Sequence, residues 1–177
     1  MHHIDDLITI FNRCFLTSHQ TQLVKGGDEP LYHPKSDAHP YHSIVFAHGF
    51  YSSALHECAH WLIAGKERRQ LVDYGYWYCP DGRDEKQQSA FEQVEVKPQA
   101  LEWLLSAACQ HKFRISNDNL TGAPTDNTAF KKAVHQQVIT YCDKGINPRA
   151  ETLRLALCQF YKTPSRLDAS NFLLDML

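Results

Sequence analysis

Residues 44–65 read IVFAHGFYSSALHECAHWLIAG, and a strand, a turn and a helix can be recognised in them. Residues 44–46 predict a short buried strand, because β-branched and aromatic residues pack well in a sheet. The glycine and serines that follow predict a turn, after which Ser52 or Ser53 is expected to cap a helix. That helix carries apolar residues at helical spacing and is expected to end at Gly65, since glycine favours the left-handed conformation of a helix terminus.

Other segments of the chain also show helical or strand patterns. Apolar spacing predicts a helix over residues 5–16, one after the polar residues 84–89, one that ends at Gly145 and one that starts at Pro148. Pro98 is expected either to kink the second of these or to open a separate helix. Strands are predicted at residues 71–78 and 113–116, whereas residues 17–43 are expected to be loop with a brief strand at Leu31 and Tyr32.

The whole chain, residues 1–177, is expected to form one domain. Of its 177 residues 43% are hydrophobic and 21% are charged, which is an ordinary composition for a protein with one buried core. The expected helices outnumber the expected strands. The fold class is therefore predicted to be α+β, mostly helical with a small sheet, and with the helix of residues 52–65 at its centre.

Charge and hydropathy exclude two classes of partner. The 18 Lys and Arg against 20 Asp and Glu give a net charge of −2, so no basic surface for nucleic acid is expected. No run reaches the roughly 18 apolar residues of a membrane span, and the first residues, MHHIDDL, lack the basic start of a signal peptide. We therefore expect a cytoplasmic protein whose six scattered cysteines stay reduced.

Eleven histidines are present, and six of them fall between residues 33 and 60. The last two belong to the HExxH motif His56-Glu57-Cys58-Ala59-His60 on the expected central helix. Positions four residues apart share one helical face, so both imidazoles can reach one metal ion, while Glu57 lies beside them about 100° round the helix. The alternative is that both histidines are satisfied by hydrogen bonds on a half-buried helix.

Two histidines leave a metal site incomplete, so a third ligand is expected from elsewhere in the chain. Residues 61–65, WLIAG, do not begin the HExxHxxGxxH extension that would supply another histidine, and a carboxylate is therefore favoured. A carboxylate on a packed helix is preferred, because a helix holds a ligand more rigidly than a loop does. The candidates are Asp73, Asp81, Asp84, Glu92, Glu95 and Glu102.

Three stretches of the chain resemble the bacterial elongation factor P hydroxylase family. They read IVFAHGFYSSALHECAHWLIAGK at residues 44–66, RRQLVDYGYWYCPDGRDE at 68–85 and FEQVEVKPQALEWL at 91–104. HExxH alone occurs in many unrelated proteins, whereas this long series is distinctive, and the likeness extends over residues 5–165. Proteins of this family are iron-dependent hydroxylases that act on the lysyl-modified lysine at the tip of elongation factor P.

The resemblance implies a metal site made by His56, His60 and a glutamate of the FEQVEVKPQ segment, which we place at Glu95. Glu92 stays an alternative, because it lies three residues earlier on the same helical face. The resemblance further implies Fe(II) as the cofactor, O2 as the co-substrate and elongation factor P as the protein partner. Two histidines and one carboxylate suit this chemistry because they leave positions on the ion open.

The runner-up function is a zinc peptidase with the same three ligands. Glu57 would then be catalytic, as the general base that takes a proton from water. In a hydroxylase Glu57 is expected instead to orient a ligand or a water molecule beside the metal. A non-enzymatic protein with a structural metal is less favoured, because cysteine usually holds structural zinc.

Aromatic residues after the central helix are candidates for substrate binding. In the expected strand, Tyr74, Tyr76 and Tyr78 alternate and would share one face. Tyr76 and Tyr78 are expected to line a groove for the aliphatic arm of a modified lysine, and the alternative is that they only pack against the sheet.

Charged residues in the same region are further candidates. Asp73 is expected to attract an ammonium group of the substrate, although acidic turns are often only solvated. Lys66, Arg68 and Arg69 can dock an acidic protein partner, or they can be an ordinary exposed helix end.

Overall fold

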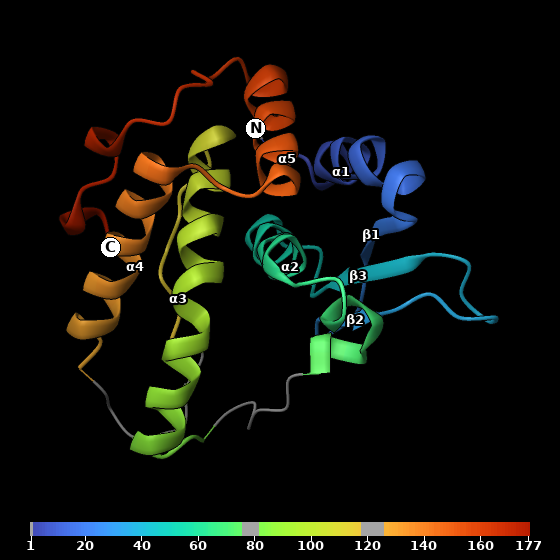
Figure 1. The fold of residues 1–177 in the computed structure, drawn as a ribbon, viewed down its shortest axis with the longest axis horizontal. Helices are drawn as coiled ribbons and strands as arrows, with labels where there is room; N and C mark the ends of the chain where they lie inside the picture. The colour runs from blue at the N-terminus through green and yellow to red at the C-terminus, as the bar shows by residue number, and fades with distance from the viewer. Residues whose placement is uncertain (1, 76–81, 118–125) are drawn as a thin grey trace.

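The computed structural model describes residues 2–75, 82–117 and 126–177, which contain five α-helices and a three-stranded sheet (Figure 1). The helices are α1 (Ile4–His19), α2 (Tyr51–Ile63), α3 (Glu85–Ala108), α4 (Thr128–Lys144) and α5 (Pro148–Tyr161). The strands are β1 (Thr21–Lys25), β2 (Leu31–His33) and β3 (His42–Phe46), and the short 3-10 helices are η1 (Arg68–Gln70), η2 (Val72–Gly75), η3 (Ala169–Asn171) and η4 (Leu174–Met176). The predicted α+β class, mostly helical with a small sheet, is confirmed.

The sheet has the strand order β1-β3-β2. β3 pairs in parallel with β1 and antiparallel with β2, so it is the middle strand, and it contains the strand predicted at residues 44–46. β1 was not predicted, because residues 17–43 were expected to be almost entirely loop. The segment has only five residues and is stabilised by its parallel pairing with β3, in which Val24 lies opposite Val45. A partner 21 residues away leaves little local signal.

The helix α2 lies between α3 on one side and β3 on the other (Figure 1). Its buried face includes Leu55, Ala59 and Leu62, none of which is exposed to solvent. On the side of α1, the rings of Phe11 and Phe15 pack 5.5 and 4.9 Å from the ring of Trp61. The HExxH motif therefore stands on a helix that neighbouring elements hold on several sides.

Both ends of α2 differ from the prediction. The helix begins at Tyr51 without a side-chain cap, and the hydroxyl of Ser53 instead accepts a hydrogen bond from the Ala47 N–H at 3.0 Å. It ends at Ile63, before Gly65, whose backbone is not left-handed.

Side chains outside α2 satisfy the carbonyls at its end. Arg69 donates to the Ala64 carbonyl at 2.6 Å, and Arg149 donates to the carbonyls of Leu62 and Ala64 at 3.0 and 2.8 Å. Cations at this end also interact favourably with the helix dipole, by about 0.3–2 kcal/mol each. A terminus capped from outside the helix carries no signal in the local sequence.

Two predicted strands are wrong where the structure describes them. Val72–Gly75 form the 3-10 helix η2, with left-handed backbone at Asp73 and Tyr74, rather than an extended strand. Residues 113–116 are irregular, because the side chain of Gln99 takes the place of a neighbouring strand. Its amide donates to the Ser116 carbonyl at 2.7 Å and accepts from the Ser116 N–H at 3.0 Å.

The remaining helices agree with the sequence patterns, except that α3 begins at Glu85, within the polar residues 84–89 after which it was predicted. α3 runs through Pro98 as one helix, so the alternative of a separate helix there is wrong. Asp84 caps α3 by accepting a hydrogen bond from the Gln87 N–H at 2.9 Å. The predicted end of α4 at Gly145 and start of α5 at Pro148 are both confirmed.

Two expectations drawn from composition agree with the described residues. Cys14, Cys58, Cys109, Cys142 and Cys158 are all unpaired. Within the described ranges, none of the helices combines the length and the apolar character that crossing a membrane would require.

Candidate metal centre

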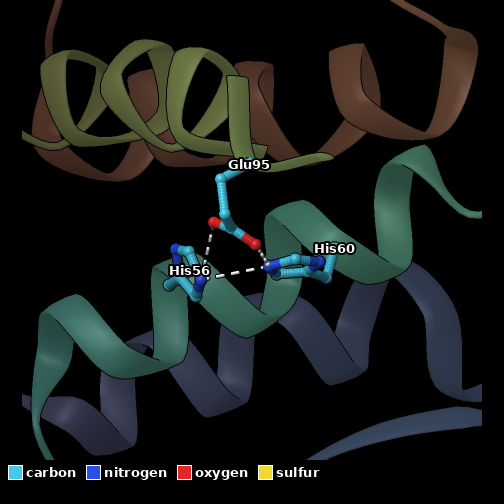
Figure 2. A group of neighbouring side chains, drawn as sticks. All are labelled: His56, His60 and Glu95. Carbon is cyan, nitrogen blue, oxygen red and sulfur yellow. Dashed lines mark hydrogen bonds and ion pairs between the residues drawn. The ribbon is translucent and has the colours of Figure 1, made fainter. Parts of the chain in front are cut away.

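Three side chains converge between α2 and α3. His56 and His60 project from the same face of α2, and Glu95 reaches them from α3 (Figure 2). The two Nε2 atoms lie 3.0 Å apart, and the Glu95 carboxylate oxygens lie 3.5 Å from Nε2 of His56 and 3.2 Å from Nε2 of His60. We call these three residues the triad.

The spacing of the triad fits a shared metal ion. Ligand atoms about 2.1 Å from an ion and 90–109° apart would lie about 3.0–3.4 Å from one another. The two Nε2 atoms are 3.0 Å apart, and the separations of 3.2 and 3.5 Å, which join His60 to Oε1 and His56 to Oε2 of Glu95, are close to this range. No other group of three or more His, Cys, Asp or Glu side chains in the described parts of the chain could share an ion.

The charges in the triad favour a bound cation. Burial alone would raise the pKa of Glu95, but the neighbouring His60 and His56 lower it to about 2. Burial alone would lower the pKa of His56, but its hydrogen bond to Glu102 and the charge of Glu95 raise it to about 10. The carboxylate is thus ionised at neutral pH and attracts positive charge, which a divalent metal can supply in place of imidazole protons.

Glu102 fixes the ring of His56 from the other side. Its carboxylate accepts a hydrogen bond from Nδ1 of His56 at 2.9 Å, and the residue is only 7% exposed. In the neutral imidazole that binds a metal, a proton on Nδ1 leaves Nε2 with a free lone pair facing the triad. Partners of this kind orient metal-binding histidines in many proteins. Glu102 was predicted only as a candidate third ligand. Its place seven residues after Glu95, on the same face of α3, could have indicated that it lies next to the same histidines.

The structure brings Glu95, and not Glu92, next to the two histidines. Glu95 is 1% exposed, whereas Glu92 is half-buried and accepts a hydrogen bond from the Gln88 side chain at 3.2 Å. The role of His56, His60 and Glu95 as metal ligands stays a prediction, which their geometry supports.

Glu57 follows His56 in α2 and is half-buried. Burial raises its pKa, together with the negative charges of Glu95 and Asp73, and the two histidines of the triad partly oppose this shift. Glu57 is therefore a carboxylate close to the triad that can accept a hydrogen bond or, in a peptidase, a proton.

The predicted substrate contacts are only partly described. Asp73 accepts a hydrogen bond from the Tyr32 N–H at 2.8 Å, so one of its oxygens holds β2. Tyr76 and Tyr78 lie outside the described residues, and their role stays a prediction. Arg69 turns inward to cap α2, with its guanidinium 5.8 Å from the Trp61 ring, and is not part of an exposed docking surface.

A cavity of about 670 Å³ opens beside the triad. His60 and Glu95 form part of its wall, together with residues 63–68, at and after the end of α2, and Gln93, Val94, Lys97 and Pro98 of α3. Pockets that bind small ligands usually have volumes of about 300–1,000 Å³. The cavity is therefore large enough to admit a long side chain up to the triad.

Comparison with known proteins agrees with the resemblance in the sequence. The chain matches the elongation factor P hydroxylase family over residues 10–172, which include all of α2 and α3. It is 57% identical over 171 residues to the elongation factor P lysine hydroxylase of Haemophilus influenzae, and this match covers 97% of the chain and 96% of the relative. The chain therefore belongs to the elongation factor P hydroxylase family.

Proposed function

We propose that this protein is an Fe(II)- and O2-dependent hydroxylase that acts on the lysyl-modified lysine of elongation factor P. The observation that carries the proposal is the triad, in a chain 57% identical to a protein named for lysine hydroxylation of this factor. Two imidazoles and one carboxylate form the donor set of many non-haem Fe(II) oxygenases. A translation factor as the substrate also agrees with the expected cytoplasmic location.

The residues of the site have separate tasks under this proposal. His56, His60 and Glu95 would hold the iron, and Glu102 keeps the Nε2 atom of His56 available to it. Bound iron would supply the activation of dioxygen that oxidation of an unreactive C–H bond requires. Insertion of one oxygen atom into the C–H bond, with the other released as water, would require two electrons from an external reductant and two protons.

The cavity beside the triad is the proposed route for the substrate side chain. Ile63, Val94 and Pro98 give its wall apolar surface that suits the methylene groups of a lysine arm. Lys66 and Lys97 are exposed at the same cavity. Their positive charge favours an acidic surface on the partner protein around the modified lysine.

The identity of the metal tests this function directly. The metal-free protein should be reconstituted anaerobically with either Fe(II) or Zn(II) and then mixed with modified elongation factor P, a reductant and air. We expect the intact mass of the factor to rise by one oxygen atom with the iron form alone. Iron-loaded protein kept without O2 and elongation factor P without the modification are the controls, and neither should show the added mass.

Substitution of Glu57 separates the hydroxylase from the zinc peptidase. Glu57→Gln keeps the shape of the side chain but removes its basicity. In a hydroxylase the variant should retain Fe(II) and lose no more than about tenfold in rate, whereas loss of a general base usually lowers the rate by about 10²–10⁴-fold. The measurement is iron content and hydroxylation rate, with peptide cleavage assayed in the zinc form. Cleavage by the wild-type zinc form that disappears in Glu57→Gln would favour the peptidase.

A further inference from the structure

Tyr74 lies against the triad, although it comes from the segment after η1. Its ring stacks on the ring of Tyr32, with the centroids 4.3 Å apart and 18° between the planes. The same ring lies nearly parallel to the ring of His60, at 6.5 Å and 12°. Because Tyr74 is only 5% exposed, a phenol is held in the interior beside one of the candidate metal ligands.

The hydroxyl group of Tyr74 is buried and has no hydrogen-bond partner among the described residues. Buried tyrosine hydroxyls normally find a partner, because an unpaired polar group in the interior is unfavourable. A phenylalanine would fill the same space without this penalty. Packing therefore explains the ring of Tyr74 but not its hydroxyl.

The backbone around Tyr74 is strained. Asp73 and Tyr74 have φ angles of 47° and 59°, in the left-handed region that bulky residues rarely adopt. Two hydrogen bonds hold this conformation: the Tyr32 N–H donates to Asp73 at 2.8 Å, and Arg68 donates to the Tyr74 carbonyl at 3.1 Å. Strain of this kind persists mostly at functional sites, where the structure fixes a side chain in one place.

Glu57 offers the complementary group. It lies three residues before His60 and therefore on the neighbouring part of the α2 surface. Its carboxylate takes part in no hydrogen bond within the described residues. Burial raises the pKa of Tyr74, and the negative charge of Glu57 raises it further. A phenol carries its proton at neutral pH in any case, so Tyr74 offers a donor. The Tyr74 hydroxyl, a donor, and the Glu57 carboxylate, an acceptor, thus both belong to neighbours of His60, and neither has a hydrogen-bond partner among the described residues.

We propose that Tyr74 is a positioning residue for Glu57: its hydroxyl donates a hydrogen bond, directly or through one water molecule, that fixes the Glu57 carboxylate beside the triad. The activity part of the test rests on the function proposed above. The spectroscopic and stability parts do not depend on it.

The test compares Tyr74→Phe, Glu57→Ala and the double variant. Tyr74→Phe removes one hydroxyl, so we expect unchanged iron affinity, a melting temperature equal to or above that of the wild type, and a kcat about tenfold lower at unchanged KM. In the double variant, Tyr74→Phe should add no further loss to that of Glu57→Ala, because the acceptor is already gone. The absorption spectrum of the Co(II)-substituted protein should follow the same non-additive pattern.

Tyr32→Phe is the matched control. Its hydroxyl already donates to the Arg69 carbonyl at 2.8 Å and lies 3.0 Å from Nδ1 of His42. We expect this variant to melt at a lower temperature yet to keep its activity and its Co(II) spectrum. Wild-type kcat and spectrum in Tyr74→Phe, or fully additive effects with Glu57→Ala, would overturn the pairing. If the wild type hydroxylates nothing, the proposed function fails, and the Co(II) spectra alone still decide whether the two residues are coupled.

Discussion

Replacing His56 or His60 with alanine is expected to abolish both iron retention and hydroxylation while the protein stays folded. Each histidine supplies one of three converging ligand atoms, and two remaining ligands hold a divalent ion far less tightly. The fold should survive because the buried face of α2 is formed by other residues, such as Leu55 and Leu62. Iron content after gel filtration, intact-mass analysis of elongation factor P and circular dichroism provide the three measurements.

Glu95 and Glu92 give a matched pair for the same experiment. Both are glutamates of α3 and lie three residues apart, but only Glu95 contacts the histidines. Glu95→Gln should therefore lose iron as the histidine variants do, and Glu92→Gln should retain iron and activity. Near-normal iron content in His56→Ala or His60→Ala would refute the assignment of the site.

The helix of the metal centre was predictable because its signals are local. Residues 52–65 combine helical apolar spacing with HExxH, and both depend only on neighbours in the chain. Its ends were not predictable, since Arg149 caps the last carbonyls from a segment more than 80 residues away. β1 was missed for a similar reason, because the strand is stabilised by its pairing with β3 and its own five residues carry no clear strand pattern.

The residues of the metal centre were likewise predictable only where their signals are local. The spacing of His56 and His60 follows from the helix, but the choice between Glu92 and Glu95 depends on how α3 is rotated against α2. That rotation is set by packing along the whole of α3 and has no local signature. Tyr74 reaches the site only because the chain turns at η2, where a strand was predicted. Its place beside His60 could therefore not be predicted from the alternation of tyrosines in the sequence.

Glu102→Gln is expected to weaken metal binding about 10- to 100-fold, which is the usual effect of removing a carboxylate that orients a metal-binding histidine. The variant keeps the size of the side chain but removes its negative charge, so the ring of His56 is held less firmly and binds the metal less strongly. The dissociation constant for Co(II) or Fe(II), measured by competition with a chelator, gives the size of the effect. Glu92→Gln is again the control, because it makes the same chemical change on the same helix away from His56.

Titration with excess Fe(II) shows how Glu102 acts. If Glu102 works only through His56, saturating Fe(II) should restore most of the hydroxylation rate of Glu102→Gln, because the ligand set itself is intact. The same excess should not rescue His56→Ala, which lacks a ligand. An unchanged dissociation constant in Glu102→Gln would mean that this carboxylate only satisfies a buried imidazole. A large drop in melting temperature without weaker metal binding would assign Glu102 to the stability of the α2–α3 contact, because breaking a buried charged pair usually destabilises a protein by about 3–5 kcal/mol.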